Sequence, residues 1–169
     1  MQTLFILLSG VYAYPEVTKN RGNLNVEVNV NNHSDKNEKV VVVNELFDNT
    51  GKSVGKNRKT ISVAGGKDSK VETKLTVSKP ALWSIDNPNL YTLKTTVLLN
   101  GKEIDSSETK TGFRTYTFDP NKGFALNGEW MKVKGVCIHH DAGVLGSAVP
   151  KDVWKRRLEN LKSTSTCFI

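Results

Sequence analysis

The sequence NLNVEVNV at residues 23–30 alternates strictly between polar and apolar side chains. A period of two residues is typical of a β-strand that buries one face and leaves the other in water. The polar cluster at residues 31–35 then predicts a turn. We therefore expect a strand here, and similar apolar runs separated by turn signals continue along the first two thirds of the chain.

Further strands are predicted on both sides of this one. Apolar runs bounded by Gly, Asn and Asp occur near residues 11–14, 40–47, 59–63, 71–77, 90–99 and 103–111. Asn100-Gly101, between the last two runs, is a strong signal for a two-residue hairpin turn. About seven short strands within about 100 residues are typical of an immunoglobulin-like β-sandwich. We expect this mainly β domain to span residues 1–112.

Length and composition set the broad class of the protein. The 169 residues provide room for one domain and part of another, with a hydrophobic fraction of 37% that is ordinary for a soluble globular chain. The longest apolar run, residues 4–8, is far shorter than the roughly 20 residues that cross a bilayer. It favours a strand over a secretory signal, because no basic segment precedes it and the run is short. We expect no membrane partner.

Charge and cysteine content exclude further classes. The net charge of +7 is spread thinly, and no aromatic side chains interleave with the lysines to stack on bases, so we expect no nucleic-acid partner. Cys137 and Cys167 form no CxxC motif, which argues against a disulfide scaffold or a zinc ribbon. We expect Cys137 to be buried and inert.

The segment 82–91, LWSIDNPNLY, interrupts the rhythm of the strands. Trp83 and Tyr91 flank an Asp-Asn-Pro-Asn turn, and two interpretations remain open. An exposed aromatic pair would bind sugar by stacking, whereas a buried pair would close one end of the sandwich. The second interpretation is the more common one for such a pair in a β-sandwich.

The pattern changes after Gly112. Residues 113–118 predict a short strand, and residues 124–133 predict a hairpin that turns at Asn127-Gly128. The apolar run 136–138 suits a parallel strand covered on both faces. A Gly-rich loop follows, and then a helix from Pro150 that places Trp154, Leu158 and Leu161 on one face. Strand, loop and helix in this order form the opening unit of an α/β fold.

The run KGVCIHHD at residues 134–141 carries the candidate site. In an extended strand, His139 and Asp141 share one face with Cys137, and His140 points the other way. Imidazole and carboxylate groups at the end of a strand are suited to hydrogen-bonding sugar hydroxyls. We therefore take Asp141 and His139 as candidate substrate-binding residues.

Other roles for this run remain open. His-His-Asp suggests a zinc site, but neighbouring residues of one strand rarely reach the same ion and no further histidine follows, so we expect no metal. His139 would suit general acid-base chemistry, although no Ser or Cys arrangement supports a nucleophile. The three side chains could also simply cap the strand. We expect no cofactor.

Four segments, taken in order, resemble glycoside hydrolase family 2, the β-galactosidase and β-glucuronidase family. They are residues 82–91, the GFR at 112–114, the FALNG at 124–128 and the run 134–141, and the helix around 157–162 is similar as well. The resemblance implies a jelly-roll sugar-binding domain, an immunoglobulin-like domain and a (β/α)₈ catalytic barrel. This chain would hold the second domain, residues 1–112, and a truncated N-terminal piece of the barrel, residues 113–169.

The resemblance also implies a function. The family hydrolyses terminal β-linked sugars with retention, and the subtype here is most similar to β-galactosidases. Two glutamates perform that chemistry, and they come from later barrel strands, so we assign no catalytic residue and expect this chain to be inactive alone. The acidic position of the strand-one motif contacts the sugar, which makes Asp141 the contact and His139 and His140 its neighbours.

Three questions stay open at this point. The stretch 163–169 departs from the second barrel strand that the resemblance implies, and reads as a truncation or an altered frame. An immunoglobulin-like module that binds carbohydrate or a protein partner by itself is the alternative function. The sugar specificity, the oligomeric state and the compartment, whether periplasmic, secreted or cytoplasmic, are left undetermined.

Overall fold

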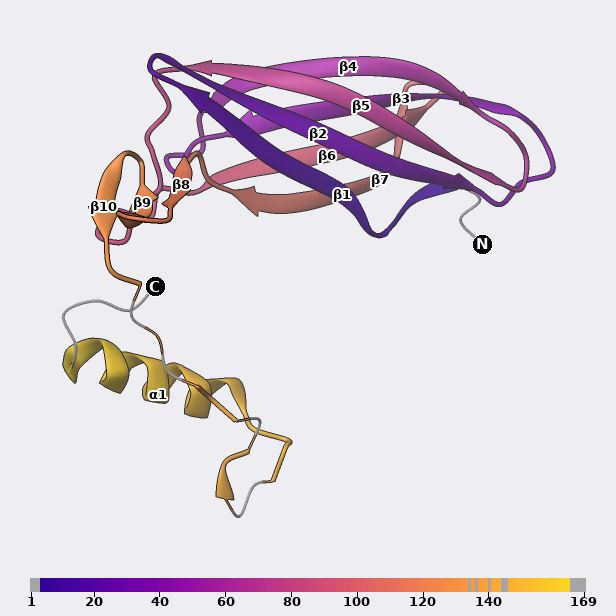
Figure 1. Ribbon diagram of the computed structural model, residues 1–169. Coiled ribbons are helices and arrows are strands. Elements are labelled where there is room, and N and C mark those ends of the chain that lie inside the picture. The colour runs from indigo at the N-terminus through magenta and orange to yellow at the C-terminus, as the bar shows by residue number, and fades with distance from the viewer. Residues whose placement is uncertain (1–3, 134, 136, 140, 144–145, 165–169) are drawn as a thin grey trace. The chain divides into compact units, whose positions relative to one another are not determined.

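A computed structural model describes residues 4–133, 135, 137–139, 141–143 and 146–164, the side chains of residues 7–9 and 164 excepted. The chain divides into two compact units, Met1–Thr115 and Tyr116–Ile169 (Figure 1). No helix among these described residues is both long and apolar enough to cross a bilayer.

The first unit is a sandwich of two antiparallel sheets (Figure 1). One sheet has the strand order β1-β2-β5 and the other the order β4-β3-β6-β7. The strands are β1 (Leu4–Thr18), β2 (Arg21–Asn32), β3 (Glu38–Phe47), β4 (Ser53–Val63), β5 (Lys67–Ser78), β6 (Tyr91–Leu99) and β7 (Lys102–Thr111). Three strands facing four in this order form an immunoglobulin-like sandwich, which confirms the predicted fold class.

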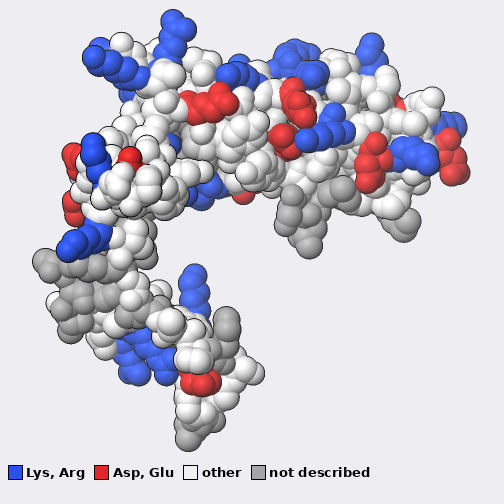
Figure 2. Space-filling model, in the orientation of Figure 1, with Lys and Arg blue, Asp and Glu red and all other residues white. Residues whose placement is uncertain are grey.

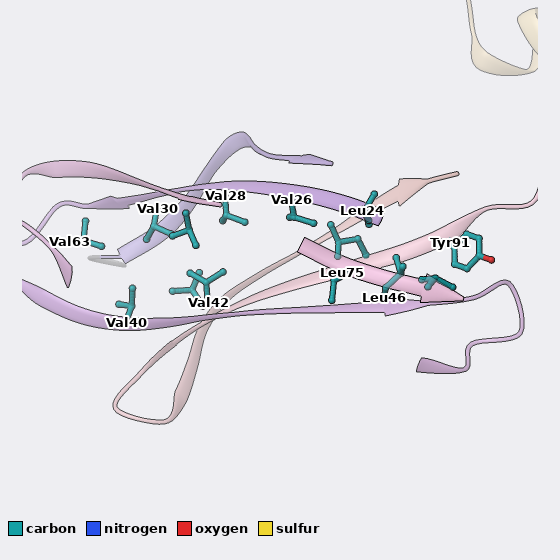
Figure 3. Close-up of a cluster of buried hydrophobic side chains, with 14 of the residues drawn as sticks. Leu24, Val26, Val28, Val30, Val40, Val42, Leu46, Val63, Leu75 and Tyr91 are labelled. Carbon is teal, nitrogen blue, oxygen red and sulfur yellow. The ribbon is translucent and has the colours of Figure 1, made fainter. Parts of the chain in front are cut away.

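Strict alternation along β2 produces the core. Leu24, Val26, Val28 and Val30 are all buried, whereas the residues between them are only half-buried. Figure 3 shows these side chains pointing toward those of the opposite sheet. Each fully buried Val or Leu contributes about 1.5–3 kcal/mol relative to an exposed one. The two faces of the strand predicted from the sequence are therefore the two faces observed.

One polar layer crosses this apolar core. Asn44 of β3 and Thr95 of β6 are both fully buried and lie opposite each other in the strand register. The Thr95 hydroxyl donates to Asn44 Oδ1 at 2.7 Å, and Asn44 Nδ2 donates to Thr73 Oγ1 of β5 at 2.9 Å. The layer therefore joins the two sheets by hydrogen bonds, and each of the three polar groups has a partner.

Tyr91 closes one end of the sandwich. It is 5% exposed, its hydroxyl accepts the Ala81 N–H at 2.9 Å, and its ring meets the Phe113 ring edge-on at 5.0 Å. A tyrosine at the start of this strand that bonds backbone upstream is the tyrosine corner of immunoglobulin-like sandwiches. Trp83 is half-buried and lies under the Arg114 guanidinium at 5.1 Å. The burial of Tyr91 therefore favours the structural interpretation of the aromatic segment.

Both predicted two-residue turns have the expected geometry. Asn100 and Gly101 have φ values of 51° and 79°, and Asn127 and Gly128 have 52° and 88°. Positive φ at both central residues defines the type I′ turn, which matches the twist of the strands that it joins. The hairpins that turn at residues 100–101 and 127–128 are therefore set by local sequence.

The described residues of the second unit include a small sheet and a helix. The sheet has the order β10-β9-β8, from β8 (Tyr116–Asp119), β9 (Gly123–Leu126) and β10 (Glu129–Met131), and the helix is α1 (Lys151–Thr164). The predicted strand at 113–118 therefore begins later, at Tyr116. Phe113 is instead fully buried in the core of the first unit.

The predictions of a strand at 136–138 and of a buried Cys137 are both wrong. Cys137 and Ile138 are exposed and lie in no strand, and Val136 is outside the described residues. A parallel strand needs strands at its edges, and the described residues supply none to this segment. On α1, the predicted face of Trp154, Leu158 and Leu161 is only partly covered: Trp154 and Leu161 are half-buried, whereas Leu158 is 54% exposed.

Candidate functional site

The predicted site residues line a groove in the second unit. His139 and Asp141 both contribute to a groove of about 490 Å³. Its described lining is Cys137, Ile138, His139, Asp141, Arg157, Asn160 and Leu161. His139 and Asp141 are therefore brought together with Cys137, although the strand expected to do this is not formed. His140, the third candidate, lies outside the described residues.

The backbone after Asp141 folds back on itself in a tight turn. The Ala142 N–H donates to the Gly146 carbonyl oxygen at 3.2 Å, and the Gly146 N–H donates to the Gly143 carbonyl oxygen at 3.0 Å. Gly143 and Gly146 have φ values of 61° and 57°, a region that glycine adopts at little cost. The glycines of the loop predicted from the sequence thus allow the chain to turn immediately after Asp141.

Helix α1 supplies the other wall of the groove. It begins at Lys151, directly after Pro150, whose carbonyl oxygen accepts the Val153 N–H at 3.0 Å. An acidic residue in the first turn and a basic one in the last, Asp152 and Lys162, complement the helix dipole.

Sequence reasoning missed the contribution of this helix to the groove. Arg157, Asn160 and Leu161 line it together with His139 and Asp141. Their spacing of three and four residues places them on one face of a helix, and this was the signal available in the sequence.

Arg157 connects the two walls. Its Nη1 donates to the carbonyl oxygen of Asp141 at 2.9 Å, and its guanidinium lies over the Trp154 ring at 5.2 Å from the centroid. Arg157 is half-buried, unlike the exposed Arg156 beside it. The helix therefore contacts the backbone of the candidate site residue directly.

The chemistry of the groove is that of polar recognition. The imidazole of His139, the carboxylate of Asp141 and the amide of Asn160 provide donors and acceptors suited to hydroxyl groups. Asp141 is the one carboxylate among the described lining residues, whereas a retaining glycosidase uses two. The Cys137 thiol is exposed, which corrects the expectation that it would be buried.

A metal site needs several ligating side chains close together. Within the ranges that the structure describes, no group of three or more His, Cys, Asp or Glu residues is placed to hold a metal ion.

Some of the basic side chains of the first unit are paired with carboxylates. Lys56 bonds Glu45 at 2.8 Å, and Lys70 contacts both Glu27, at 2.6 Å, and Glu72, at 3.2 Å. The hydrogen bonds to Glu27 and then Glu72 raise the pKa of Lys70 above its usual value. Figure 2 shows blue and red groups side by side on the visible face of this unit. The positive net charge is thus not gathered into one continuous patch on that face.

Two further grooves lie on the first unit. One, of about 620 Å³, runs over the outer face of the four-stranded sheet, with Val43, Lys94 and Leu98 in its lining. The other, of about 550 Å³, lies between the turn at residues 48–51 and the segment 86–92. The predicted site residues line neither of them.

Known proteins resemble this chain in sequence and in fold. Residues 6–114 match the family model of the glycosyl hydrolases family 2. The beta-galactosidase BoGH2A of Bacteroides ovatus is 43% identical over 139 residues, which cover 82% of this chain and 16% of that protein. A beta-glucuronidase of Bacteroides fragilis is 32% identical over 142 residues, or 83% of this chain and 20% of that protein.

A solved structure leads to the same family. A glycosyl hydrolase family 2 member from Bacteroides cellulosilyticus superimposes with a TM-score of 0.89 at 31% identity, covering 95% of this chain and 21% of that one. The chain thus spans about a fifth or less of the length of these relatives. The family match covers most of the residues of the sandwich, and the chain belongs to the glycosyl hydrolases family 2.

Proposed function

We propose that this chain is part of a retaining glycoside hydrolase that acts on terminal β-linked sugars, and that it does not catalyse hydrolysis alone. The observation that carries the proposal is the groove in which His139 and Asp141 lie together, beyond a sandwich that matches family 2. Residues 1–112 would be the immunoglobulin-like domain of the whole enzyme. Residues 113–169 would be the start of its catalytic barrel.

Asp141 is the proposed contact to the sugar. A carboxylate accepts hydrogen bonds from two adjacent hydroxyl groups, and hydrogen bonds to a charged partner are stronger than neutral ones. His139 lines the same groove and is a neighbour of that contact. His140 is assigned the same neighbouring role from the family resemblance alone. Neither catalytic glutamate of the retaining mechanism has a counterpart among these candidate residues.

A β-galactoside is the proposed substrate. The relative at 43% identity is named a beta-galactosidase, whereas the beta-glucuronidase of Bacteroides fragilis reaches 32%. An immunoglobulin-like module that binds sugar through exposed aromatic rings is less well supported. Tyr91, one of its two proposed rings, is buried and hydrogen-bonded in the core.

A turnover assay tests the claim of inactivity. The full chain, incubated with nitrophenyl β-galactoside and nitrophenyl β-glucuronide, is expected to release no nitrophenol above the protein-free blank. Hydrolysis that disappears in Asp141→Ala would overturn the claim, because a contaminating enzyme would be unaffected by that substitution.

A chimera tests the function of the whole enzyme. This chain would replace the aligned segment of the Bacteroides ovatus enzyme, and the chimera is expected to hydrolyse the galactoside. Asp141→Asn in the chimera should lower kcat/KM by about 10- to 100-fold, the range for losing a charge-assisted hydrogen bond. Asp152→Asn, at the exposed start of α1, is the matched control and should change kcat/KM little. A folded chimera on which Asp141→Asn has no effect would refute the role of Asp141.

A further inference from the structure

The peptide group that follows Asp141 is held from both sides. Its carbonyl oxygen accepts a hydrogen bond from Arg157 Nη1 at 2.9 Å. Its N–H, which belongs to Ala142, donates to the carbonyl oxygen of Gly146 at 3.2 Å. One bond comes from the helix and the other from the turn, so rotation of this peptide would break both.

The direction of a side chain is fixed by the backbone on either side of its Cα atom. Holding the Asp141–Ala142 peptide therefore limits the directions in which the Asp141 carboxylate can point. A contact to a sugar is sensitive to this, because a functional group must be held close to its productive geometry by its supporting residues.

Arg157 is itself held in place. A free arginine side chain has high rotamer entropy, and ordering it opposes any hydrogen bond that it makes. The Trp154 ring, three residues earlier on α1, lies 5.2 Å from the guanidinium carbon and favours one arrangement by a cation–π contact. Arg156 offers a contrast, since it is exposed and has no such ring contact among the described residues.

We propose that Arg157, stacked on Trp154, is a positioning residue that orients Asp141 for its contact with the sugar. The inference has a structural half and a functional half, and only the functional half rests on the proposed function of Asp141. The structural half concerns the backbone alone. That half states that α1 holds the Asp141–Ala142 peptide through one arginine, and it is measurable without any sugar.

Amide exchange with solvent reports on the structural half. In the ¹⁵N-labelled full chain, Arg157→Ala should accelerate exchange of the Ala142 amide by about tenfold, the factor for losing roughly one hydrogen bond. Trp154→Ala should also accelerate exchange of the Ala142 amide. Trp154→Phe, which keeps an aromatic ring, should accelerate that exchange less. Arg156→Ala, the matched control, should leave the Ala142 amide unchanged.

The amides of α1 separate positioning from simple helix stability. Alanine has the highest helix propensity, so Arg157→Ala should not weaken α1. The amides of α1 should therefore exchange at the same rate as in the wild type. Unchanged Ala142 exchange in Arg157→Ala would overturn the proposal. Equal acceleration of the α1 amides and of Ala142 would also overturn it, because Arg157 would then only stabilise the helix. Arg157→Lys, which keeps a charged donor, should restore part of the protection.

Sugar affinity tests the functional half. Titration of galactose should give a Kd that is weakened by Arg157→Ala and unchanged by Arg156→Ala. Full affinity in Arg157→Ala, despite faster Ala142 exchange, would refute the orienting role. If neither the wild type nor any variant binds galactose, the proposed function of Asp141 fails. The exchange result still decides whether Arg157 holds the Asp141–Ala142 peptide.

Discussion

The buried polar layer of the sandwich makes a strong quantitative prediction. Asn44 and Thr95 lie between two apolar layers, formed by Val42 with Val97 and by Leu46 with Leu93 in the same register. Replacing Asn44 by Leu removes the acceptor of the Thr95 hydroxyl in a place that water does not reach. Replacing Thr95 by Val instead leaves Asn44 Oδ1 without its partner at 2.7 Å.

The magnitudes follow from the cost of an unpaired buried polar group. Leaving one such group unsatisfied costs about 1–3 kcal/mol, so Asn44→Leu and Thr95→Val should each lower the free energy of unfolding by about 2 kcal/mol. Replacing both partners by apolar groups of similar shape is nearly neutral. Thr73 then keeps access to solvent because it is only half-buried. The double variant should therefore lose no more than about 1 kcal/mol, well below the sum of the single losses.

Urea unfolding followed by far-ultraviolet circular dichroism measures these values. With a slope of about 1–3 kcal/mol per molar urea, a loss of 2 kcal/mol moves the midpoint by about 1 M. Thr96→Val, one residue along β6 and on the opposite face, is the control and should shift the midpoint little. If the losses from Asn44→Leu and Thr95→Val add to within about 0.5 kcal/mol in the double variant, the reasoning is refuted.

Two further predictions concern single hydrogen-bonding groups. Tyr91→Phe leaves the Ala81 N–H without its partner and should lower the free energy of unfolding by about 1–2 kcal/mol, and an unchanged urea midpoint would show that the tyrosine corner is dispensable. The hydroxyl of Thr50 is the main cause that lowers the pKa of Asp48 below its usual value. The ionised Asp48 therefore stabilises its turn fully above about pH 4, and this contribution is lost as pH falls through the lowered pKa. The difference in midpoint between wild type and Asp48→Asn should shrink between pH 6 and pH 2, and a constant difference would contradict the assignment.

Local patterns predicted the sandwich well because they report local causes. The alternation in β2 and the Asn-Gly pairs at 100–101 and 127–128 each determine backbone geometry within a few residues. The strand around Asn44 was predicted for the same reason. Its inward-facing amide was not, because the partners Thr73 and Thr95 are remote in sequence.

The candidate site was predicted only in part because its surroundings are non-local. His139 and Asp141 were identified by residue type and order, and both line one groove. The strand expected at 136–138 failed because a parallel strand depends on neighbours that no local pattern supplies. Arg157 was missed because its contact to the Asp141 carbonyl oxygen depends on how the helix approaches the turn, across the Gly-rich loop.

A galactose titration of the ¹⁵N-labelled full chain tests the central claim most directly. The account predicts saturable shifts of the His139 and Asp141 amides, lost in Asp141→Asn and retained in Asp152→Asn. Saturable shifts centred on Trp83 and Tyr91, unaffected by Asp141→Asn, would contradict it and would favour a sugar-binding sandwich.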